Sequence, residues 1–167
     1  MDEVIQIFGS PDVDNPVRGI FRDSRFDWEY FEAKRLELFN NLELEFTEDK
    51  IENAIDRISA RANPRHLERV PAGARFDFEI ILDLYAEQDK NLLNTLLQGL
   101  KLLEDDYLGG SGTRGSGKIR FIVDAMEYRS VEYYKGEEKE IQLANKKDLE
   151  EIITQEWLEN AFSKISS

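Results

Sequence analysis

Hydrophobic residues recur with two different periods along this chain of 167 residues, and the periods predict its helices and strands. The leucines of NLLNTLLQGLKLLEDD (91–106) follow the spacing of a helix with one apolar face, and Asp89 is a candidate N-cap for it. The tail KKDLEEIITQEWLENAFSKI (146–165) predicts a second amphipathic helix. Its apolar side contains Leu149, Ile152, Ile153, Trp157, Leu158 and Phe162.

Other segments alternate apolar and polar residues, as strands do. They are VRGIFRDSRF (17–26), LELEF (42–46), FDFEIILDLY (76–85) and IRFIVDAMEY (119–128). The apolar spacing of residues 28–39 fits a helix imperfectly, so this segment is expected to form a helix or a loop. Nearer the N-terminus, a turn is indicated by Pro11, Asp12, Asn15 and Pro16. The order strand, helix, glycine-rich loop, strand from residue 76 onward is typical of half of a ferredoxin-like sheet with its helix on one face, in an α+β fold.

Composition narrows the classes of protein that the chain can belong to. Apolar residues make up 41% of the sequence, which is enough for the core of one folded unit. The absence of cysteine excludes disulfides and thiolate chemistry, and a single histidine, His66, cannot build a histidine metal cluster. With no apolar run of membrane-spanning length and no basic region at the N-terminus, we expect a cytoplasmic protein.

The formal net charge of −13 argues against nonspecific binding of nucleic acid, but the charge is uneven along the chain. Residues 57–75 contain five arginines and few acids: Arg57, Arg61, Arg65, Arg69 and Arg75. The first four recur at every fourth position, so they would line one side of a helix or fan out along an extended hairpin broken by Pro64. Alternatively, they pair with Glu52, Asp56 and Glu68 in a solvated network. His66 could stack on a base, or be incidental.

A glycine-rich, acid-free segment, LGGSGTRGSGKIRF (108–121), is the main candidate for chemistry. Its glycines lie at 109, 110, 112, 115 and 117, and it carries Arg114, Lys118 and Arg120. Glycine lets a polyanion approach the backbone and permits positive φ angles, so successive amides can point at one phosphate. The segment therefore predicts a phosphate-binding loop, with a flexible connection carrying incidental charges as the alternative.

Two nucleotide-binding patterns match this loop by letter. Gly110, Gly112 and Gly115 satisfy GxGxxG, and Gly112, Gly117 and Lys118 satisfy GxxxxGK. Both motifs require a strand before the loop and a helix after it, whereas here the predicted helix comes first. Ile119 also replaces the Ser or Thr that binds magnesium. We reject both motifs, and a phosphoryl-handling enzyme remains only an alternative function.

Three segments together resemble a known family. FGS (8–10), ENAIDRISARANPRHLERV (52–70) and LLEDDYLGGSGTRGSGKIRF (102–121) are similar, in this order and spacing, to the backbone ribonuclease subunits of type III-A CRISPR (Csm) effector complexes, which belong to the RAMP superfamily. The resemblance covers about residues 8–122. It implies a ferredoxin-like, RNA-recognition-type fold whose copies stack along a guide RNA. It also implies that residues 53–69 form or brace a thumb-like hairpin inserted between guide and target.

The resemblance assigns binding residues and partners. The implied RNA-binding residues are Asn53, Arg57, Arg61, Asn63, Arg65 and Arg69 in the first region and Gly110, Gly112, Arg114, Gly115, Gly117 and Lys118 in the second. Guide RNA, target RNA, other copies of the chain and other Csm subunits are the implied partners, with no membrane. No cofactor is expected in this chain, but Mg²⁺ is implied for cleavage of target RNA by the complete protein, with a neighbouring 2′-hydroxyl as nucleophile.

The chain departs from the family at its start. The family's N-terminal strand and RNA-cleaving aspartate precede FGS, so both are expected to be absent here. VDNPV (13–17) resembles the surroundings of that aspartate but follows FGS, which makes Asp14 a candidate catalytic residue against the alternative of a turn residue before Pro16.

We therefore expect a RAMP core lacking its N-terminal half at residues 1–122, and an extension of one strand and one amphipathic helix at 123–167. The tail helix is expected to pack on its own sheet, with capping of the missing half or docking on a neighbouring subunit as alternatives. The net charge favours a further alternative function, an acidic scaffolding module without RNA contact.

Overall fold

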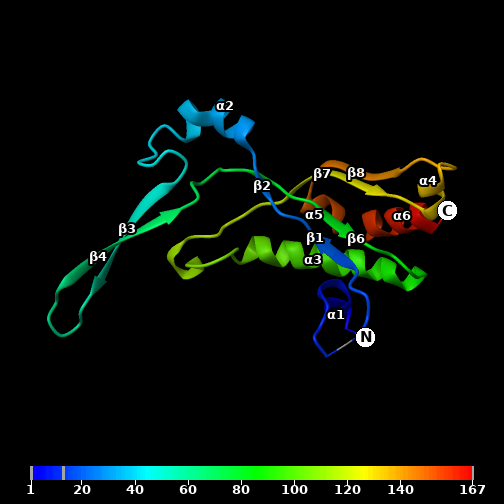
Figure 1. The fold of residues 1–167 in the computed structure, drawn as a ribbon, viewed down its shortest axis with the longest axis horizontal. Helices are drawn as coiled ribbons and strands as arrows, with labels where there is room; N and C mark the ends of the chain where they lie inside the picture. Colours follow the sequence, from blue (N-terminus) through cyan, green and yellow to red (C-terminus); the bar gives the residue numbers. More distant parts are fainter. Residues whose placement is uncertain (1, 13, 167) are drawn as a thin grey trace. The chain divides into compact units, whose positions relative to one another are not determined.

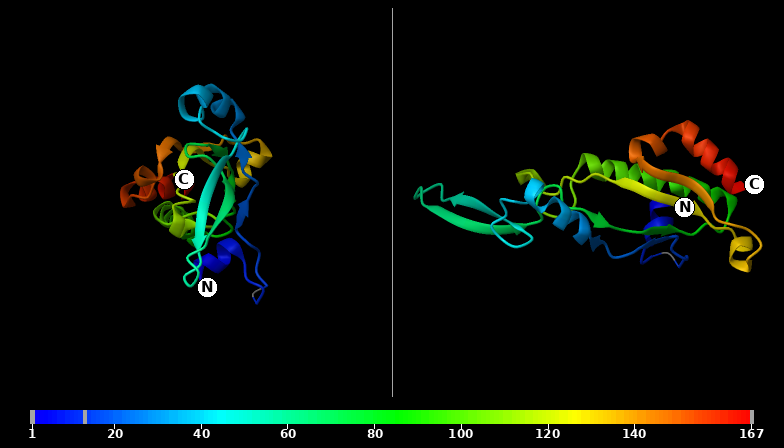
Figure 2. Two further views of the ribbon diagram at one scale, coloured as in Figure 1. Left: turned by 90° about the vertical axis from the view of Figure 1, so that its left-hand side faces the viewer. Right: turned by 90° about the horizontal axis from the view of Figure 1, so that it is seen from above.

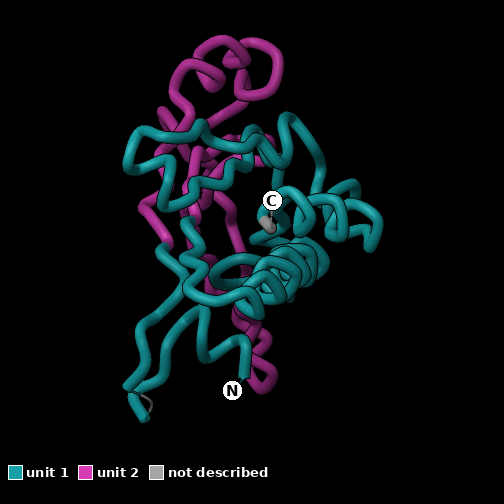
Figure 3. Tube along the Cα trace, turned by 90° about the vertical axis from the view of Figure 1, so that its right-hand side faces the viewer, with its two compact units in different colours: residues 1–20, 81–167 teal, residues 21–80 magenta. Residues whose placement is uncertain are grey.

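The computed structural model describes residues 2–12 and 14–166, which form an α+β fold (Figure 1). Two compact units make up the chain, residues 1–20 with 81–167 and residues 21–80 (Figure 3). In chain order the elements are α1 (Glu3–Phe8), β1 (Gly19–Phe21), β2 (Arg25–Phe26), α2 (Trp28–Leu38), β3 (Glu48–Ile55), β4 (Ala62–Arg69), β5 (Phe76–Asp77), β6 (Ile80–Leu82), η1 (Glu87–Asp89), α3 (Lys90–Asp105), η2 (Gly112–Arg114), β7 (Ile122–Tyr128), α4 (Val131–Lys135), β8 (Ile141–Asp148), α5 (Leu149–Ile152) and α6 (Gln155–Ser166). The predicted α+β class is confirmed.

The strands of the described residues pair two by two: β1 with β6, β2 with β5, β3 with β4, and β7 with β8. The predicted order of strand, helix, glycine-rich loop and strand is present as β6, α3, the loop and β7. However, β6 and β7 do not pair with each other, because the partner of β7 is β8 from the tail. The boundary at residue 122 between a RAMP core and a C-terminal extension stays a prediction.

In the unit of residues 21–80, an aromatic cluster holds α2. Asp27 caps this helix by accepting a hydrogen bond of 2.9 Å from the backbone N–H of Tyr30. Phe31 is fully buried and stacks on Phe39, with ring centroids 4.4 Å apart. Phe46 also packs on Phe31. The strand predicted over residues 42–46 is wrong, because these residues form no strand. Phe46 packs against the aromatic cluster instead of a neighbouring strand.

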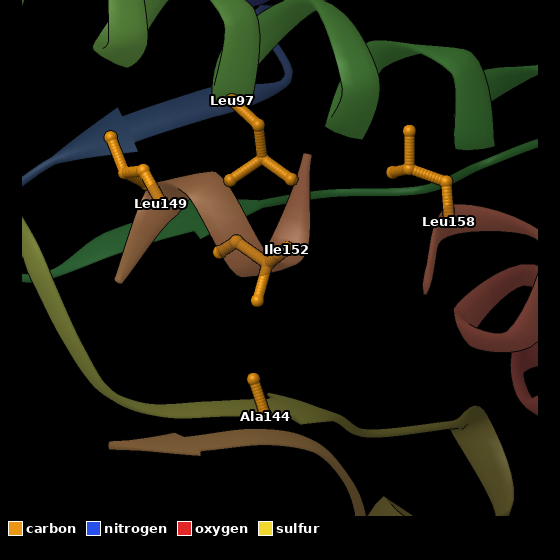
Figure 4. Close-up of a cluster of buried hydrophobic side chains, with 5 residues drawn as sticks. All are labelled: Leu97, Ala144, Leu149, Ile152 and Leu158. Carbon is orange, nitrogen blue, oxygen red and sulfur yellow. The ribbon is translucent and has the colours of Figure 1, made fainter. Parts of the chain in front are cut away.

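The core of the other unit joins α3 to the tail. Its buried members come from α3, β8, α5 and α6 (Figure 4): Leu97, Ala144, Leu149, Ile152 and Leu158. Apolar residues from the glycine loop's exit and β7, including Phe121 and Val123, pack against this cluster. The expectation that the tail helix packs on its own sheet is confirmed, because residues of α5 and α6 cluster with Ala144 of β8. Removal of these side chains from water stabilises the packed tail.

The tail is not the single helix that its periodicity predicts. Residues 146–148 belong to β8, and the helical part is divided into α5 and α6. Asp148 and Glu151 form a capping box that begins α5, and the Thr154 hydroxyl accepts a hydrogen bond from the Trp157 N–H in the first turn of α6. Each cap starts a new helix, so the apolar residues reach the core from two short segments.

The segment containing FGS forms the end of α1. Asp2 caps this helix, and Ile7 is buried where α1 packs on α3. Gly9 follows with φ +81°, and an added Cβ would lie 2.9 Å from Val17. The glycine of FGS is therefore required by this turn.

Candidate nucleic-acid interface

The arginine-rich segment forms a β-hairpin (Figures 1 and 2). Strands β3 and β4 pair antiparallel from Glu48 opposite Arg69 to Ile55 opposite Ala62. This register excludes the helical alternative and confirms the extended one. The hairpin keeps Pro64 within a strand because proline is tolerated on strands with an unpaired edge.

Asp56 organises the turn that closes the hairpin. Its backbone N–H donates to the Arg61 carbonyl at 3.0 Å, and its carboxylate accepts hydrogen bonds of 2.8 Å from the N–H groups of Ile58 and Ser59. These bonds to the charged form lower the pKa of Asp56. The turn places Arg57 and Arg61 at the end of the hairpin.

The register divides the hairpin into two faces, because residues directly opposite each other in antiparallel strands point to the same side. We call the first the arginine face: Glu48, Lys50, Glu52, Ala54, Asn63, Arg65, Leu67 and Arg69. The second is the histidine face: Asp49, Ile51, Asn53, Ile55, Ala62, Pro64, His66 and Glu68. The two predicted asparagines, Asn53 and Asn63, are thus exposed on opposite faces.

Acids neutralise only part of the hairpin's basic side chains. Arg69 Nε lies 2.8 Å from a carboxylate oxygen of Glu48, which raises the pKa of Arg69 and lowers that of Glu48. His66 pairs with Asp49 at 2.7 Å. In contrast, the exposed side chains of Arg57, Arg61 and Arg65 form no ion pair with any residue that the structure describes. The predicted network with Glu52, Asp56 and Glu68 is therefore wrong, since the acid that pairs with Arg69 is Glu48.

Hydrogen bonds shape the glycine-rich loop from within. The Leu108 N–H donates to the Gly117 carbonyl at 2.9 Å and closes the loop at its base. The Ser111 carbonyl accepts from the N–H groups of Arg114 and Ser116, at 3.0 and 3.3 Å, around the short helix η2. These bonds count against the alternative of an unstructured connection.

The sign of φ alternates along this loop. Gly109 (+83°), Ser111 (+61°), Gly115 (+81°) and Gly117 (+85°) have positive φ, whereas the intervening Gly110 and Ser116 do not. Short alternations between the two hands, such as those at 109–111 and 115–117 on either side of η2, occur in backbone arrangements that bind anions. The N–H groups of Arg114, Gly115 and Ser116 donate to carbonyls within the loop, so phosphate binding by its other amides stays a prediction.

The glycines of the loop have different reasons to be glycine. A Cβ on Gly112 would overlap the ring of Tyr107, and one on Gly117 would overlap the Leu108 carbonyl. Both are required by the loop's own packing. Gly110 has no positive φ, and a Cβ added there would have no atom within 4 Å, so the folded chain itself does not demand glycine at this position.

The basic side chains of the loop are also unequal. Lys118 donates a hydrogen bond from its ammonium to the Glu104 carbonyl at the end of α3. Arg120 lies 2.7 Å from Asp148. Arg114 is exposed on η2.

The hairpin and the loop belong to different compact units. A single groove formed by both, which the sequence suggests, therefore stays a prediction. Asp14, the candidate catalytic residue, is exposed between α1 and β1. Among residues 2–12 and 14–166, no group of three or more His, Asp and Glu side chains is placed to hold a metal ion.

Sequence reasoning missed Glu104 and Tyr107, which support the loop. No pattern in the sequence indicates the role of Tyr107, because its contact with the loop depends on the path of the loop backbone. The position of Glu104 did give a signal: it follows Leu93, Leu97 and Leu100 at helical spacing, so it is a charged residue in an apolar row.

The helices that the structure describes include none with the length and apolarity needed to cross a membrane.

Comparison with known proteins identifies the superfamily of the chain. A profile of the RAMP superfamily matches residues 2–120, and the chain belongs to this superfamily. It is 39% identical over 169 residues to the CRISPR system Cms endoribonuclease Csm3 of Methanocaldococcus jannaschii, covering 98% of this chain and 62% of that protein. It is 50% identical over 111 residues to the protein of the same name from Methanothermobacter thermautotrophicus, covering 66% and 45%.

A third relative of the same name, from Enterococcus italicus, is 40% identical over 131 residues, covering 75% of this chain and 58% of the relative. The resemblance to type III-A backbone subunits is thereby confirmed. The chain spans less than two thirds of the length of each of these relatives.

Proposed function

We propose that this chain is a guide-RNA-binding backbone subunit of a type III CRISPR interference complex and takes part in recognition of target RNA. One observation carries the proposal. The sequence has 35 acidic and 22 basic residues, so an exposed arginine has many acids available. Arg57, Arg61 and Arg65 nevertheless have no acid partner among the described residues, and all three lie on one hairpin. Such guanidinium groups suit the phosphates of RNA.

The glycine-rich loop would bind the backbone of the same RNA. Its amides and Arg114 provide the donors, and Gly110 leaves room for a sugar-phosphate chain. We infer that the remaining predicted contacts, from Asn53, Asn63, Arg69, Gly112, Gly115, Gly117 and Lys118, line these two regions. Gly112 and Gly117 would act by shaping the loop.

By analogy with the endoribonucleases that it resembles, the complete protein would cleave target RNA with Mg²⁺. The described residues include no group of three acids or histidines that could hold this metal. Asp14 is the proposed catalytic candidate. In an assembled complex, Asp14→Asn would then abolish cleavage of target RNA and leave RNA binding unchanged. Cleavage that survives in the variant complex would remove Asp14 from consideration.

The partners under this proposal are guide RNA, target RNA, further copies of the chain and other Csm subunits. Such a complex would work in the cytoplasm, where its RNA partners occur. Copies of the chain would then stack along one guide, each contributing its hairpin and its loop.

Binding of a guide-length single-stranded RNA tests the proposal. We expect Arg65→Ala and Arg114→Ala each to raise Kd about fivefold, as loss of a charge-assisted contact should. The matched controls are Arg22→Ala and Arg129→Ala, because these arginines are exposed but already paired with Glu79 and Glu127. The controls should change Kd less than about twofold. Equal Kd values for all four variants would refute the proposal.

One alternative has its own support. The net charge of −13 favours an acidic scaffolding module that touches no RNA. This alternative predicts no RNA binding by the unmodified chain even at low salt. Saturable binding of ATP, in contrast, would indicate the nucleotide-binding enzyme that the order of elements argues against.

A further inference from the structure

Glu104 lies where a buried carboxylate is unfavourable. It is in the last turn of α3, and its residue is only 8% exposed. A negative charge at the C-terminal end of a helix is disfavoured by the helix dipole, and burial adds a cost of desolvation. Asp89 is the other charged residue that is buried in the part of the chain that the structure describes. Glu104 therefore needs compensating contacts.

Those contacts go to the exit of the glycine-rich loop. One carboxylate oxygen of Glu104 accepts a hydrogen bond of 2.6 Å from the Phe121 N–H. The other oxygen lies 3.3 Å from the Lys101 ammonium. The backbone carbonyl of Glu104 accepts from the ammonium of Lys118. One residue of α3 thus holds the chain at 118 and again at 121.

Lys101 keeps the carboxylate in place. Its ammonium is shared between Glu104 and Glu150 of α5, at 3.3 and 2.9 Å, and these acids raise the pKa of Lys101. Glu104 is therefore oriented by a cation that is itself tied to the core helices. The position of Phe121, which packs against the same core, depends on this arrangement.

The loop is then held at both of its ends. Glu104 fixes the exit, and the bond from Leu108 to Gly117 closes the base. Between these points lie the residues of alternating φ and Arg114. A loop held in its binding conformation loses less entropy when it binds a ligand.

We propose that Glu104 is a positioning residue for the RNA-binding glycine loop. This inference rests on the proposed function of that loop. Simple electrostatics predicts that removal of this negative charge strengthens the binding of RNA, a polyanion. The inference predicts weaker binding, because the loss of loop geometry outweighs the reduced repulsion.

Four variants of the full chain test the inference with the same guide-length single-stranded RNA. Glu104→Met keeps the length of the side chain but has no acceptor for the Phe121 N–H. Glu104→Asp keeps the charge but is too short to reach it. We expect both to raise Kd about threefold to tenfold. Glu104→Gln retains an acceptor oxygen and should stay within about twofold of the unmodified chain.

The matched control is Asp105→Asn, which removes one negative charge from the exposed neighbouring position in the same turn. It should leave Kd unchanged or lower it slightly. Kd is measured at a temperature below the melting temperature of every variant. If Glu104→Met does not fold, the difference in Kd between Glu104→Asp and Glu104→Gln tests the inference. The dependence of Kd on salt should also become shallower in Glu104→Asp, since fewer phosphates are contacted.

A purely structural role would lower the melting temperature of the Glu104 variants without changing the Kd of the folded protein, and this result would overturn the inference. Arg114→Ala, measured alongside, separates two kinds of failure. If Arg114→Ala weakens binding and the Glu104 variants do not, the positioning role is wrong and the proposed function stands. If Arg114→Ala is also without effect, the loop does not bind RNA, so the positioning role and the loop's part in the proposed function are both wrong, and Arg65→Ala then decides whether the hairpin binds RNA.

Discussion

Individual arginines of the hairpin differ in whether an acid neutralises them, and this difference matters more than their number. Arg69 and Arg65 lie on the same face, yet among the described residues Arg69 has a carboxylate within contact distance, that of Glu48, and Arg65 has none. The sequence spacing of the arginines is uniform, so it could not distinguish them. The register places an acid opposite both, but Glu52, opposite Arg65, lies 3.5 Å from Lys50 instead.

Gly110 and Gly112 provide a prediction at the same scale. Gly112→Ala forces the new methyl group against Tyr107, so we expect a loss of stability of about 1–3 kcal/mol as well as weaker RNA binding. Gly110→Ala meets no neighbouring atom, so the melting temperature should be unchanged while Kd for RNA rises. Thermal unfolding and RNA titration of both variants check this. If Gly110→Ala binds RNA like the unmodified chain, the backbone of the RNA does not approach the loop at residue 110.

At the scale of elements, the turn of the hairpin depends on the charge of one carboxylate. Asp56 accepts hydrogen bonds from Ile58 and Ser59, and these bonds lower its pKa. A group whose pKa is lowered by folding contributes stability above its unfolded pKa, and the contribution is lost as pH falls through the lowered value. We therefore expect the turn to loosen only at pH values below the ordinary range for aspartate.

An NMR titration measures this directly. The carboxyl carbon of Asp56 should titrate below the ordinary range for aspartate, and the Ser59 amide shift should follow it. In Asp56→Ala, the Ser59 amide should exchange faster with solvent at neutral pH. An ordinary pKa for Asp56 would show that the two hydrogen bonds are not maintained in solution.

The helices and strands differ in how well sequence patterns predict them. Helix α3 is predictable because a long row of leucines at helical spacing has few other interpretations. The short alternation at 42–46 misleads, because so few residues do not separate a strand from a loop; Phe46 packs on Phe31, whereas Leu44 is exposed. The tail reads as one helix in the sequence, since its periodicity continues across the break between α5 and α6.

For the whole molecule, the question is how a chain with a net charge of −13 could bind RNA. Charge acts over distances comparable to the Debye length, so local cations can prevail near contact while the remaining surface repels. The described residues support this at the hairpin, where Arg57, Arg61 and Arg65 have no acid partner among them.

The dependence of RNA affinity on salt tests this balance. If Arg57, Arg61, Arg65 and Arg114 each meet one phosphate, log K should fall against log salt with a slope of about −3. Arg114→Ala should make the slope shallower by about 0.7. A scaffolding protein repelled by RNA would show affinity that rises with salt, and that outcome would favour the acidic alternative.

By itself, the sequence determined the class of fold, the superfamily, the arginine-rich and glycine-rich segments, and the helix that precedes the glycine loop. These depend on local periodicity, on backbone freedom at glycine, and on residue types in a fixed order. Only the tertiary structure decided which arginines have acid partners, which glycines the loop needs for its own packing, and that Glu104 supports the loop's exit. Those features are set by residues that are distant in sequence and meet only when strands align and helices pack, so no local pattern could specify them.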